Sequence, residues 1–228
     1  MRPIVPITRV DQVRQAVLQM IFSGTLRPGQ RLVEARLAAD LGVSQATVNT
    51  ALLDLDGQGI VTKVLNRSTN VCRYTEIEIE NLFLVRSILE PAAAAAASRK
   101  LQPEGRRALE DQVNAMRKAA REEDLPGFCL ADYTFHQELV ALTQNSFLIQ
   151  ASQAIAAAPF AYILCDCPSA LPTDYRSLAE DHQAVVEALV QGPKTAERTV
   201  RERIAAWSMH SVRALESRPR ERRVYAYR

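Results

Sequence analysis

The stretch 31–56, RLVEARLAADLGVSQATVNTALLDLD, decides how the front of this chain folds. Apolar residues recur at helical spacing on both sides of Gly42, which is free to take a positive φ and so ends the first helix. Ser44 is placed to cap the second helix, because its hydroxyl can accept from an unpaired backbone N–H. Val43 is expected to be buried at the turn. The stretch therefore predicts a helix-turn-helix.

The second helix of this pair offers a polar face at its N-terminal end. Its residues are small or carry amides and hydroxyls: Ser44, Gln45, Ala46, Thr47 and Asn49. A helix with such side chains suits the major groove of DNA. The alternative is an ordinary helical hairpin with a solvated outer face, since this spacing is common in helical proteins.

The flanking sequences favour a winged helix-turn-helix. A helix capped by Thr8 is predicted over 9–23. After the helix-turn-helix, 60–64 is predicted as a strand and 70–72 as its return strand. A wing at this place meets backbone phosphate or the minor groove of DNA. The tip of the hairpin carries three polar or basic residues, Lys63, Asn66 and Arg67.

Charge is distributed unevenly along the 228 residues. Residues 1–75 carry nine Lys or Arg against five Asp or Glu, and residues 76–217 are acidic. The tail 218–228 carries five Arg against one Glu and is predicted to be disordered. A basic front on an acidic body is typical of nucleic-acid contact through the front.

The composition indicates a soluble, mainly α protein. Alanine is abundant, which favours helices, and no run of about 18 apolar residues occurs. No signal peptide opens the sequence, so we expect a cytoplasmic protein that does not contact the membrane. The four cysteines include no CxxC pair and are interpreted as reduced thiols.

The acidic body is predicted to be an antiparallel bundle of about six helices with a central pocket. The first helix spans 76–100, with Pro91 expected to kink or interrupt it. The predicted domains are a winged helix over 8–74 and a helical effector-binding and dimerisation domain over 76–217. Four residues of the first helix are expected to point inward: Leu82, Phe83, Val85 and Leu89. The other helices are predicted over 103–123, 125–144, 146–164, 174–191 and 194–216.

Three polar residues of the predicted bundle form a candidate metal site. Asp132 and His136 lie four residues apart on one helix face, and His182 lies on the inner stripe of another helix. A carboxylate and two imidazoles suit a divalent Zn, Ni, Mn or Fe ion. The alternative is that the two histidines are ordinary core residues with satisfied hydrogen bonds.

The front of the chain resembles the opening of the GntR family of bacterial transcription regulators. The resemblance lies in IFSGTLRPGQRLVEARLAADLGVS at 21–44. Four later motifs resemble its FadR-like subfamily, which joins a winged helix to an all-helical effector (FCD) domain. They are VRSILEP at 85–91, DYTFH at 132–136, NSFL at 145–148 and DHQAVVEAL at 181–189.

The resemblance implies DNA-contacting residues in the head, with informative departures. Arg36 is retained, but Gln45 and Asn49 stand where the family usually has arginines. The family's usual Pro and wing Gly are replaced by Thr47 and Ser68. Amides prefer the adenine edge whereas Arg prefers guanine, so we expect an A·T-weighted operator and weaker phosphate attraction.

The resemblance also implies a metal held by one Asp and three His in the bundle. The last His would fall near Arg203 or Ile204. Two alternatives follow. In the first, Asp132, His136 and His182 still hold a metal, and Arg203 points outward or toward the acid group of an effector. In the second, the metal is lost and Arg203 forms a buried ion pair with Asp132. Two further residues match effector-binding positions of the subfamily. For Arg86 the alternatives are contact with the pocket, an interaction with Glu90 across the helix, or a surface salt bridge. Asn145 matches the motif, but helix capping alone would explain it.

The combined observations predict an effector-controlled transcription regulator, most often a repressor in this family. Its partners would be operator DNA, a second copy of the chain and a small carboxylate effector. Two rivals remain: a metal-dependent enzyme in the bundle, which lacks a general base or nucleophile motif, and a regulator that has lost DNA readout because of Gln45 and Asn49.

Overall fold

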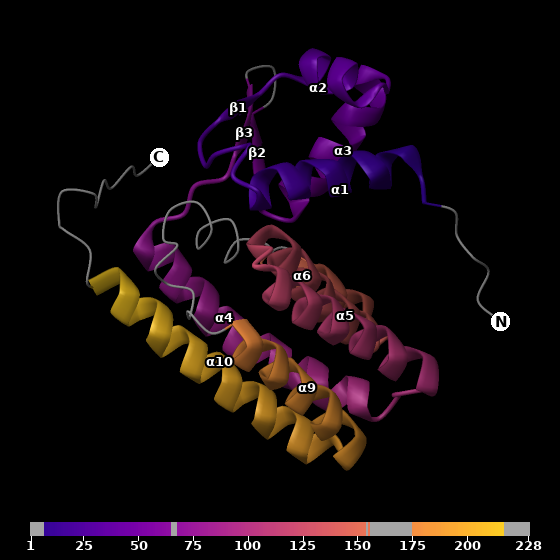
Figure 1. Ribbon diagram of the computed structural model, residues 1–228, viewed down its shortest axis with the longest axis vertical. Helices are drawn as coiled ribbons and strands as arrows, with labels where there is room; N and C mark the ends of the chain where they lie inside the picture. Colours follow the sequence, from indigo (N-terminus) through magenta and orange to yellow (C-terminus); the bar gives the residue numbers. More distant parts are fainter. Residues whose placement is uncertain (1–6, 65–67, 154, 156–174, 217–228) are drawn as a thin grey trace.

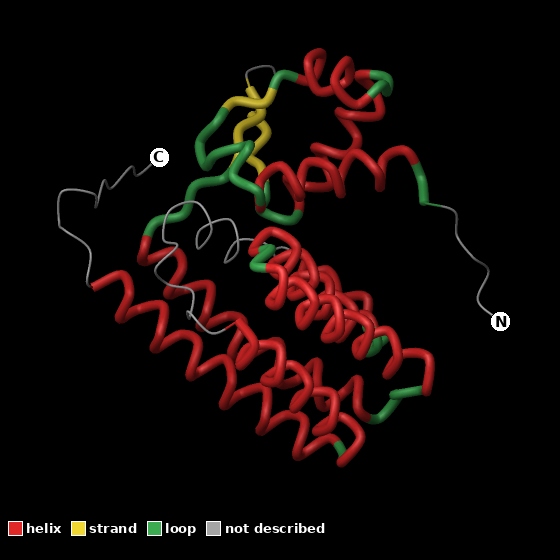
Figure 2. The backbone as a smooth tube through the Cα atoms, in the orientation of Figure 1, coloured by secondary structure: helices red, strands yellow, loops and turns green. Residues whose placement is uncertain are grey.

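A computed structural model describes residues 7–64, 68–153, 155 and 175–216. Three helices and a small sheet form a head, and long helices form a bundle beneath it (Figures 1 and 2). The mainly α class with an N-terminal winged helix-turn-helix is confirmed. None of the helices in these ranges combines the length and apolar character that crossing a membrane needs.

The head contains the predicted helices. Thr8 caps the first one in a capping box with Asp11, and Gly42 ends the second at a φ of 64°. Ser44 caps the third by accepting from the N–H of Thr47. Val43 at the turn is only half-buried, because it packs at the edge of the core rather than inside it. The three helices are α1 (Arg9–Phe22), α2 (Glu34–Leu41) and α3 (Gln45–Gly57).

The wing is a three-stranded antiparallel sheet in the order β1-β3-β2. Its strands are β1 (Arg31–Leu32), β2 (Val61–Val64) and β3 (Ser68–Val71). The return strand starts at Ser68 instead of the predicted 70, because Val64 pairs directly with Ser68 and the connection is short. The sequence did not predict β1, since two residues are too few to show a strand's alternation.

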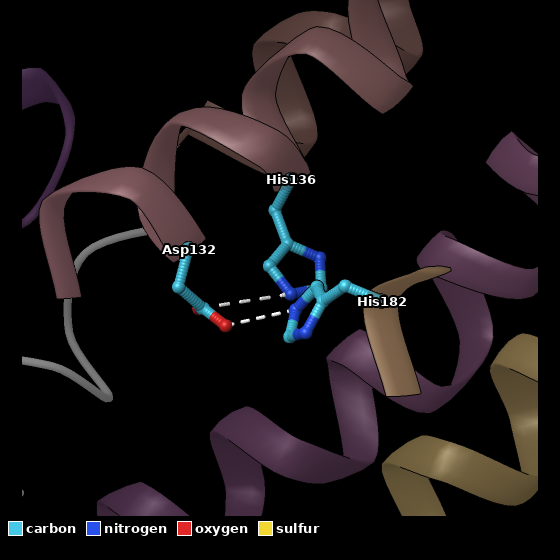
Figure 3. Close-up of side chains that lie close together, drawn as sticks. All are labelled: Asp132, His136 and His182. Atoms are coloured by element: carbon cyan, nitrogen blue, oxygen red, sulfur yellow. Dashed lines mark ion pairs between the residues drawn. The ribbon is translucent and has the colours of Figure 1, made fainter. Parts of the chain in front are cut away.

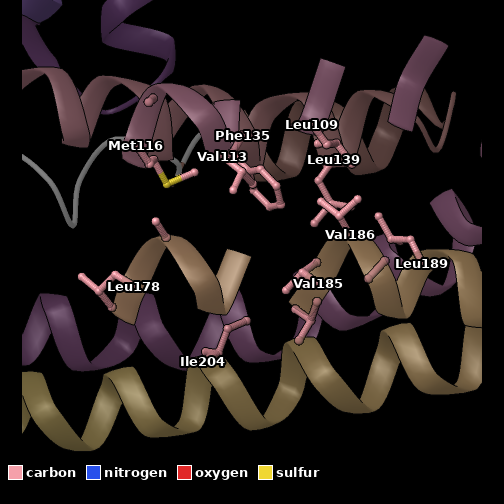
Figure 4. Packing of buried hydrophobic residues seen from close by; sticks show 14 of the residues in the cluster. Leu109, Val113, Met116, Phe135, Leu139, Leu178, Val185, Val186, Leu189 and Ile204 are labelled. Carbon is pink, nitrogen blue, oxygen red and sulfur yellow. The ribbon is translucent and has the colours of Figure 1, made fainter. Parts of the chain in front are cut away.

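The bundle places α4 and α10 side by side, and α5 packs against both α6 and α9 (Figure 1). Apolar side chains of α5 and α6 face those of α9 and α10 and form the core (Figure 4). The helix predicted over 146–164 is described only as far as Gln153. The helices are α4 (Glu76–Ser98), α5 (Pro103–Glu122), α6 (Leu125–Ala141), α7 (Ser146–Gln153), α9 (Tyr175–Gln191) and α10 (Pro193–Glu216).

Helix α4 departs from the prediction at two places. It continues through Pro91, which contradicts the predicted interruption; the alanines at 92–97 have high helix propensity, and α4 packs along α10. Val85 is exposed instead of inward, and the buried stripe passes through Arg86 and Glu90. Two charged side chains therefore occupy core positions that a hydrophobicity pattern assigns to apolar residues.

The head rests on the bundle of its own chain through α6. Cys129 and Tyr133 belong to the same core cluster as the buried residues of α1 and α3. Tyr133 donates its hydroxyl to Gln58 Oε1 at 2.8 Å and packs edge-on against Phe22. Tyr74 adds a hydrogen bond to the carbonyl oxygen of Gly59. Helix α6 thus contributes to the cores of both parts.

Candidate DNA-binding surface and buried Asp-His-His site

The N-terminal end of α3 presents a small polar surface. Gln45 and Ala46 are exposed, while the Thr47 hydroxyl lies 2.8 Å from the hydroxyl of Ser44. On α2 the Arg36 side chain is 83% exposed, with Asp40 a loose 3.8 Å away. These predicted contact residues therefore lie on the surface of the head and remain candidates for DNA contact.

Two other predicted contact residues, Asn49 and Lys63, are engaged inside the head. Lys63 Nζ lies 2.7 Å from Glu34 Oε1, and Asn49 Nδ2 donates to Glu34 Oε2 at 3.2 Å. Sequence reasoning missed Glu34, because its partners are 15 and 29 residues away and no local pattern links them. Asn66, Arg67 and the tail 218–228 lie outside the described residues.

The structure brings together Asp132, His136 and His182 (Figure 3). Asp132 and His136 face the same way because one helical turn of α6 separates them, and α9 supplies His182. His182 Nε2 lies 2.8 Å from Asp132 Oδ1, and His136 Nε2 lies 3.8 Å from Asp132 Oδ2. The three predicted ligands therefore converge on one point of the bundle.

Both imidazoles direct their Nε2 atoms toward Asp132, and an acceptor holds the Nδ1 atom of His182. Nδ1 of His182 donates to the carbonyl oxygen of Leu178 at 2.7 Å. Nδ1 of His136 lies 3.1 Å from Glu90 Oε2, within ion-pair distance but in a geometry that makes no hydrogen bond. For His182, the acceptor on Nδ1 fixes the ring orientation in which Nε2 faces the candidate metal position. One ligand atom from each residue lies within 4.8 Å of the others, so the set fits a divalent ion.

Burial and charge act in opposite directions on these groups. Burial alone would lower the pKa of His182, but the Asp132 carboxylate raises it above its usual value. Burial would raise the pKa of Asp132, yet His182 lowers it. The carboxylate therefore stays ionised, as a metal ligand must be.

Glu90 and Arg86 belong to the wall of the same site. Arg86 Nε donates to Glu90 Oε1, and the two side chains are only 10% and 8% exposed. Burial opposes ionisation of Glu90, but Arg86 and then His136 lower the pKa of its carboxyl. Arg86 thus reaches the pocket and braces Glu90, and its interpretation as a surface salt bridge is wrong. The sequence named Glu90 only as a partner of Arg86 and did not predict it in the wall of the site, because an Arg–Glu pair four residues apart resembles a solvated helix pair.

Arg203 does not pair with Asp132. Its guanidinium bonds to Asp181 Oδ1 at the edge of the site and is 40% exposed, while Ile204 beside it is buried. The predicted Arg203–Asp132 ion pair is therefore wrong, because His182 already occupies that carboxylate. The alternative in which Asp132, His136 and His182 hold a metal and Arg203 lies outside them stays a prediction.

Asn145 serves as a helix cap. Its Oδ1 accepts from the backbone N–H groups of Phe147 and Leu148 at the start of α7, and its side chain is exposed. It is not among the described residues that line the cavities at the metal site. Its capping role explains its presence without a ligand.

Two adjoining cavities share the wall formed by Arg86, Glu90 and His136. The first has a volume of about 60 Å³ and includes Asp132, His182 and Arg203 in its lining. The second has a volume of about 350 Å³ and lies between α4, α6 and α7. The buried Asp-His-His site therefore adjoins a cavity on each of two sides.

Comparisons with known families agree with this architecture. Residues 81–206, more than half of the chain, match the family described as "FCD domain". Residues 9–71 match "Bacterial regulatory proteins, gntR family". The chain belongs to the GntR family of bacterial regulatory proteins. It is a DNA-binding transcription regulator and carries an FCD domain after its winged helix.

Relatives of this GntR regulator have regulatory names. It is 29% identical over 201 residues to the "Probable D-xylose utilization operon transcriptional repressor" of Paenarthrobacter nicotinovorans, covering 88% of this chain and 87% of that protein. It is 24% identical to the gluconate operon transcriptional repressor of Bacillus licheniformis, covering 74% and 70%. These relatives are regulators, so the enzyme interpretation of the bundle is set aside.

The fold of this GntR regulator also matches a solved structure. E. coli McbR/YncC superposes with a TM-score of 0.69 over 92% of this chain and 98% of that chain, at 20% identity. At this identity the likeness supports the fold alone.

Proposed function

We propose that this GntR regulator is a homodimeric repressor whose hold on DNA is controlled by a small carboxylate metabolite bound in its bundle. The observation that carries the proposal is the convergence of Asp132, His136 and His182 on a cavity whose rim holds Arg203. Two winged heads of a dimer would lie on a near-palindromic operator. An effector that prefers one arrangement of the heads shifts the population away from the DNA-bound one.

Asp132, His136 and His182 would hold one divalent metal ion. Bound there, the ion supplies a Lewis-acidic position for an oxygen of the effector. About 60 Å³ accommodates an ion with a few waters, since a water needs about 10–15 Å³ on this measure. The effector would therefore extend into the adjoining cavity of about 350 Å³.

Arg203 would take part in recognising the acid. A guanidinium binds a carboxylate with two parallel hydrogen bonds, and the partner that Arg203 already has is itself a carboxylate, Asp181. An anionic effector would compete with Asp181 for this group. The gluconate operon repressor named above makes sugar acids the first compounds to examine.

The test is metal analysis of untagged protein with three single variants. We expect about one metal per chain in the wild type and a loss in His136→Ala and His182→Ala. His210→Ala, which removes the remaining histidine of the chain, is the matched control and should keep the metal. A metal-free wild type, or a metal retained in both site variants, would refute the metal site and leave Arg203 as the anchor of the acid.

The DNA side is tested by selecting binders from a random duplex pool. Gln45, the exposed amide at the start of α3, supports an adenine-containing half-site. A guanine-anchored half-site would contradict this readout. Failure to enrich any sequence would instead favour a head that has lost specific recognition.

A further inference from the structure

A half-buried polar cluster joins α2, α3 and the wing. Glu34, the first residue of α2, receives Lys63 Nζ at 2.7 Å on Oε1. It also accepts from Asn49 Nδ2, at 3.2 Å on Oε2 and 3.4 Å on Oε1. The Lys63 and Glu34 side chains are only 16% and 29% exposed. One carboxylate thus accepts hydrogen bonds from two residues on the predicted DNA-binding surface.

We propose that Glu34 is an internal competitor for DNA phosphate that withholds Lys63 and Asn49 from contact. The proposal rests on the proposed use of the winged head for DNA contact and adds a regulator of its affinity. A carboxylate and a phosphate accept from the same ammonium and amide donors. Phosphate must therefore compete with Glu34 for these donors, and the Lys63 side chain stays mostly buried in the head while Glu34 holds it.

The cluster has the features of a fixed arrangement. The hydrogen bond from Lys63 lowers the pKa of Glu34 despite partial burial, and the Asn49 hydrogen bond acts in the same direction. The backbone N–H of Lys63 donates to Asp56 Oδ1 at 2.8 Å, which ties strand β2 to α3. Lys63 is therefore held at both its backbone and its side chain.

Arg36 provides the contrast on the same helix. Its side chain is almost fully exposed, and its acidic neighbour Asp40 is 3.8 Å away and exposed. Arg36 is available to DNA as it stands, whereas Lys63 is not. The pair Arg36–Asp40 thus supplies a natural control for the effect of removing one negative charge from α2.

The experiment measures how salt affects binding of a labelled mixed-sequence DNA duplex, by fluorescence anisotropy, for full-length wild type and Glu34→Gln. Each phosphate contact adds about 0.9 to the slope of log affinity against log salt concentration. We expect Glu34→Gln to bind more tightly at low salt, with a slope steeper by about 0.9 per head. Asp40→Asn, which removes the same charge without releasing Lys63, should keep the wild-type slope.

Lys63→Met identifies the released group. We expect it to leave the wild-type slope unchanged and to abolish the gain when combined with Glu34→Gln. A shallower slope in Lys63→Met alone would mean that Lys63 already binds phosphate, and would overturn the proposal. A weaker, less stable Glu34→Gln with an unchanged slope would also overturn it, by assigning Glu34 a structural role only.

Failure of the proposed function gives a different result. If neither wild type nor Glu34→Gln binds the duplex at any salt concentration, the head does not contact DNA and both proposals fall. If both bind with equal slopes, DNA contact stands and only the competitor is refuted.

Discussion

At the scale of single residues, the buried Arg86–Glu90 pair on α4 sets the polarity of the candidate site. Breaking such a pair leaves an unpaired charge in the core, which costs about 3–5 kcal/mol. We expect Glu90→Ala to lower the free energy of unfolding by this amount. The double variant Arg86→Met/Glu90→Met should regain most of it, because no unpaired charge remains. Urea denaturation measures both.

The matched control for this prediction is Arg106–Glu110 on α5. It has the same residue types at the same spacing but lies on the surface. Glu110→Ala should cost under about 1 kcal/mol, as exposed pairs do. Equal losses in the two helices would show that burial of the α4 pair contributes nothing.

Ile204 offers a residue-scale test of the metal site. It is buried, lines the cavity and stands near the position where the family resemblance places a further His. We expect Ile204→His to raise zinc affinity about tenfold or more, since even outer partners of a metal site change affinity by about 10–100-fold. Competition with a chelator gives the affinity.

Arg203→His is the neighbouring control. Because Arg203 lies at the rim and pairs with Asp181, an imidazole there should add little affinity. A larger gain at 203 than at 204 would mean that the rim position faces the ion.

The residues of the site were predictable where their positions were local. Asp132 and His136 lie one turn apart, so the sequence places them on one face, and His182 follows from its own helical stripe. Glu90 could not be found in this way, because a charged residue on a buried stripe contradicts the hydrophobic pattern. The partners of Arg203 and Lys63 depend on how distant helices and strands meet.

At the scale of elements, Ser44 tests the start of α3. Its hydroxyl accepts from the N–H of Thr47 at 3.1 Å. Ser44→Ala should lower the free energy of unfolding by about 1 kcal/mol, the usual value of an N-cap, as measured by urea denaturation. Ser23→Ala is the control, because that exposed hydroxyl donates to a carbonyl at the end of α1 and caps no helix N-terminus. Equal effects would argue against a capping contribution.

The predicted elements match the structure best where local chemistry sets their ends. Capping residues and Gly42 define the helices of the head, and the sequence contains both signals. The predicted start of the return strand was wrong because strand ends depend on pairing across the sheet. The predicted interruption at Pro91 was wrong because α4 continues through it and packs along α10.

At the scale of the whole molecule, Tyr133 links the stability of the head to that of the bundle. Burial raises its pKa from 10 to about 12. Folding therefore favours the protonated phenol, so its contribution is complete below pH 10 and is lost as pH rises toward 12. The loss amounts to at most about 3 kcal/mol at 1.36 kcal/mol per pKa unit.

We expect the wild type to lose stability over this alkaline window and Tyr133→Phe to lose less of it. At pH 8 the variant should be about 1 kcal/mol less stable, because the hydrogen bond to Gln58 is gone. Thermal unfolding at a series of pH values measures both effects. Tyr175→Phe, which leaves Tyr133 in place, should retain the wild-type loss, and an equal loss in Tyr133→Phe would contradict the assignment.

The arrangement of head and bundle was not predictable from the sequence. The predicted domain bounds, 8–74 and 76–217, leave only a short connection and do not show which surfaces of the two parts meet. The residues that join them, Cys129 and Tyr133, lie in the middle of a bundle helix, where nothing in the pattern distinguishes them from residues of the bundle core.

Helix α6 belongs to both the candidate metal site and the core of the head, so its movement would affect both. Asp132 and Tyr133 are consecutive residues, yet the first faces the candidate metal and the second is embedded in the core of the head. Because both residues belong to one helix, a rotation of α6 that moves Asp132 at the cavity would also move Tyr133 in the core of the head. Helix α6 would couple the ligand site to the head directly, without a chain of intermediate side chains.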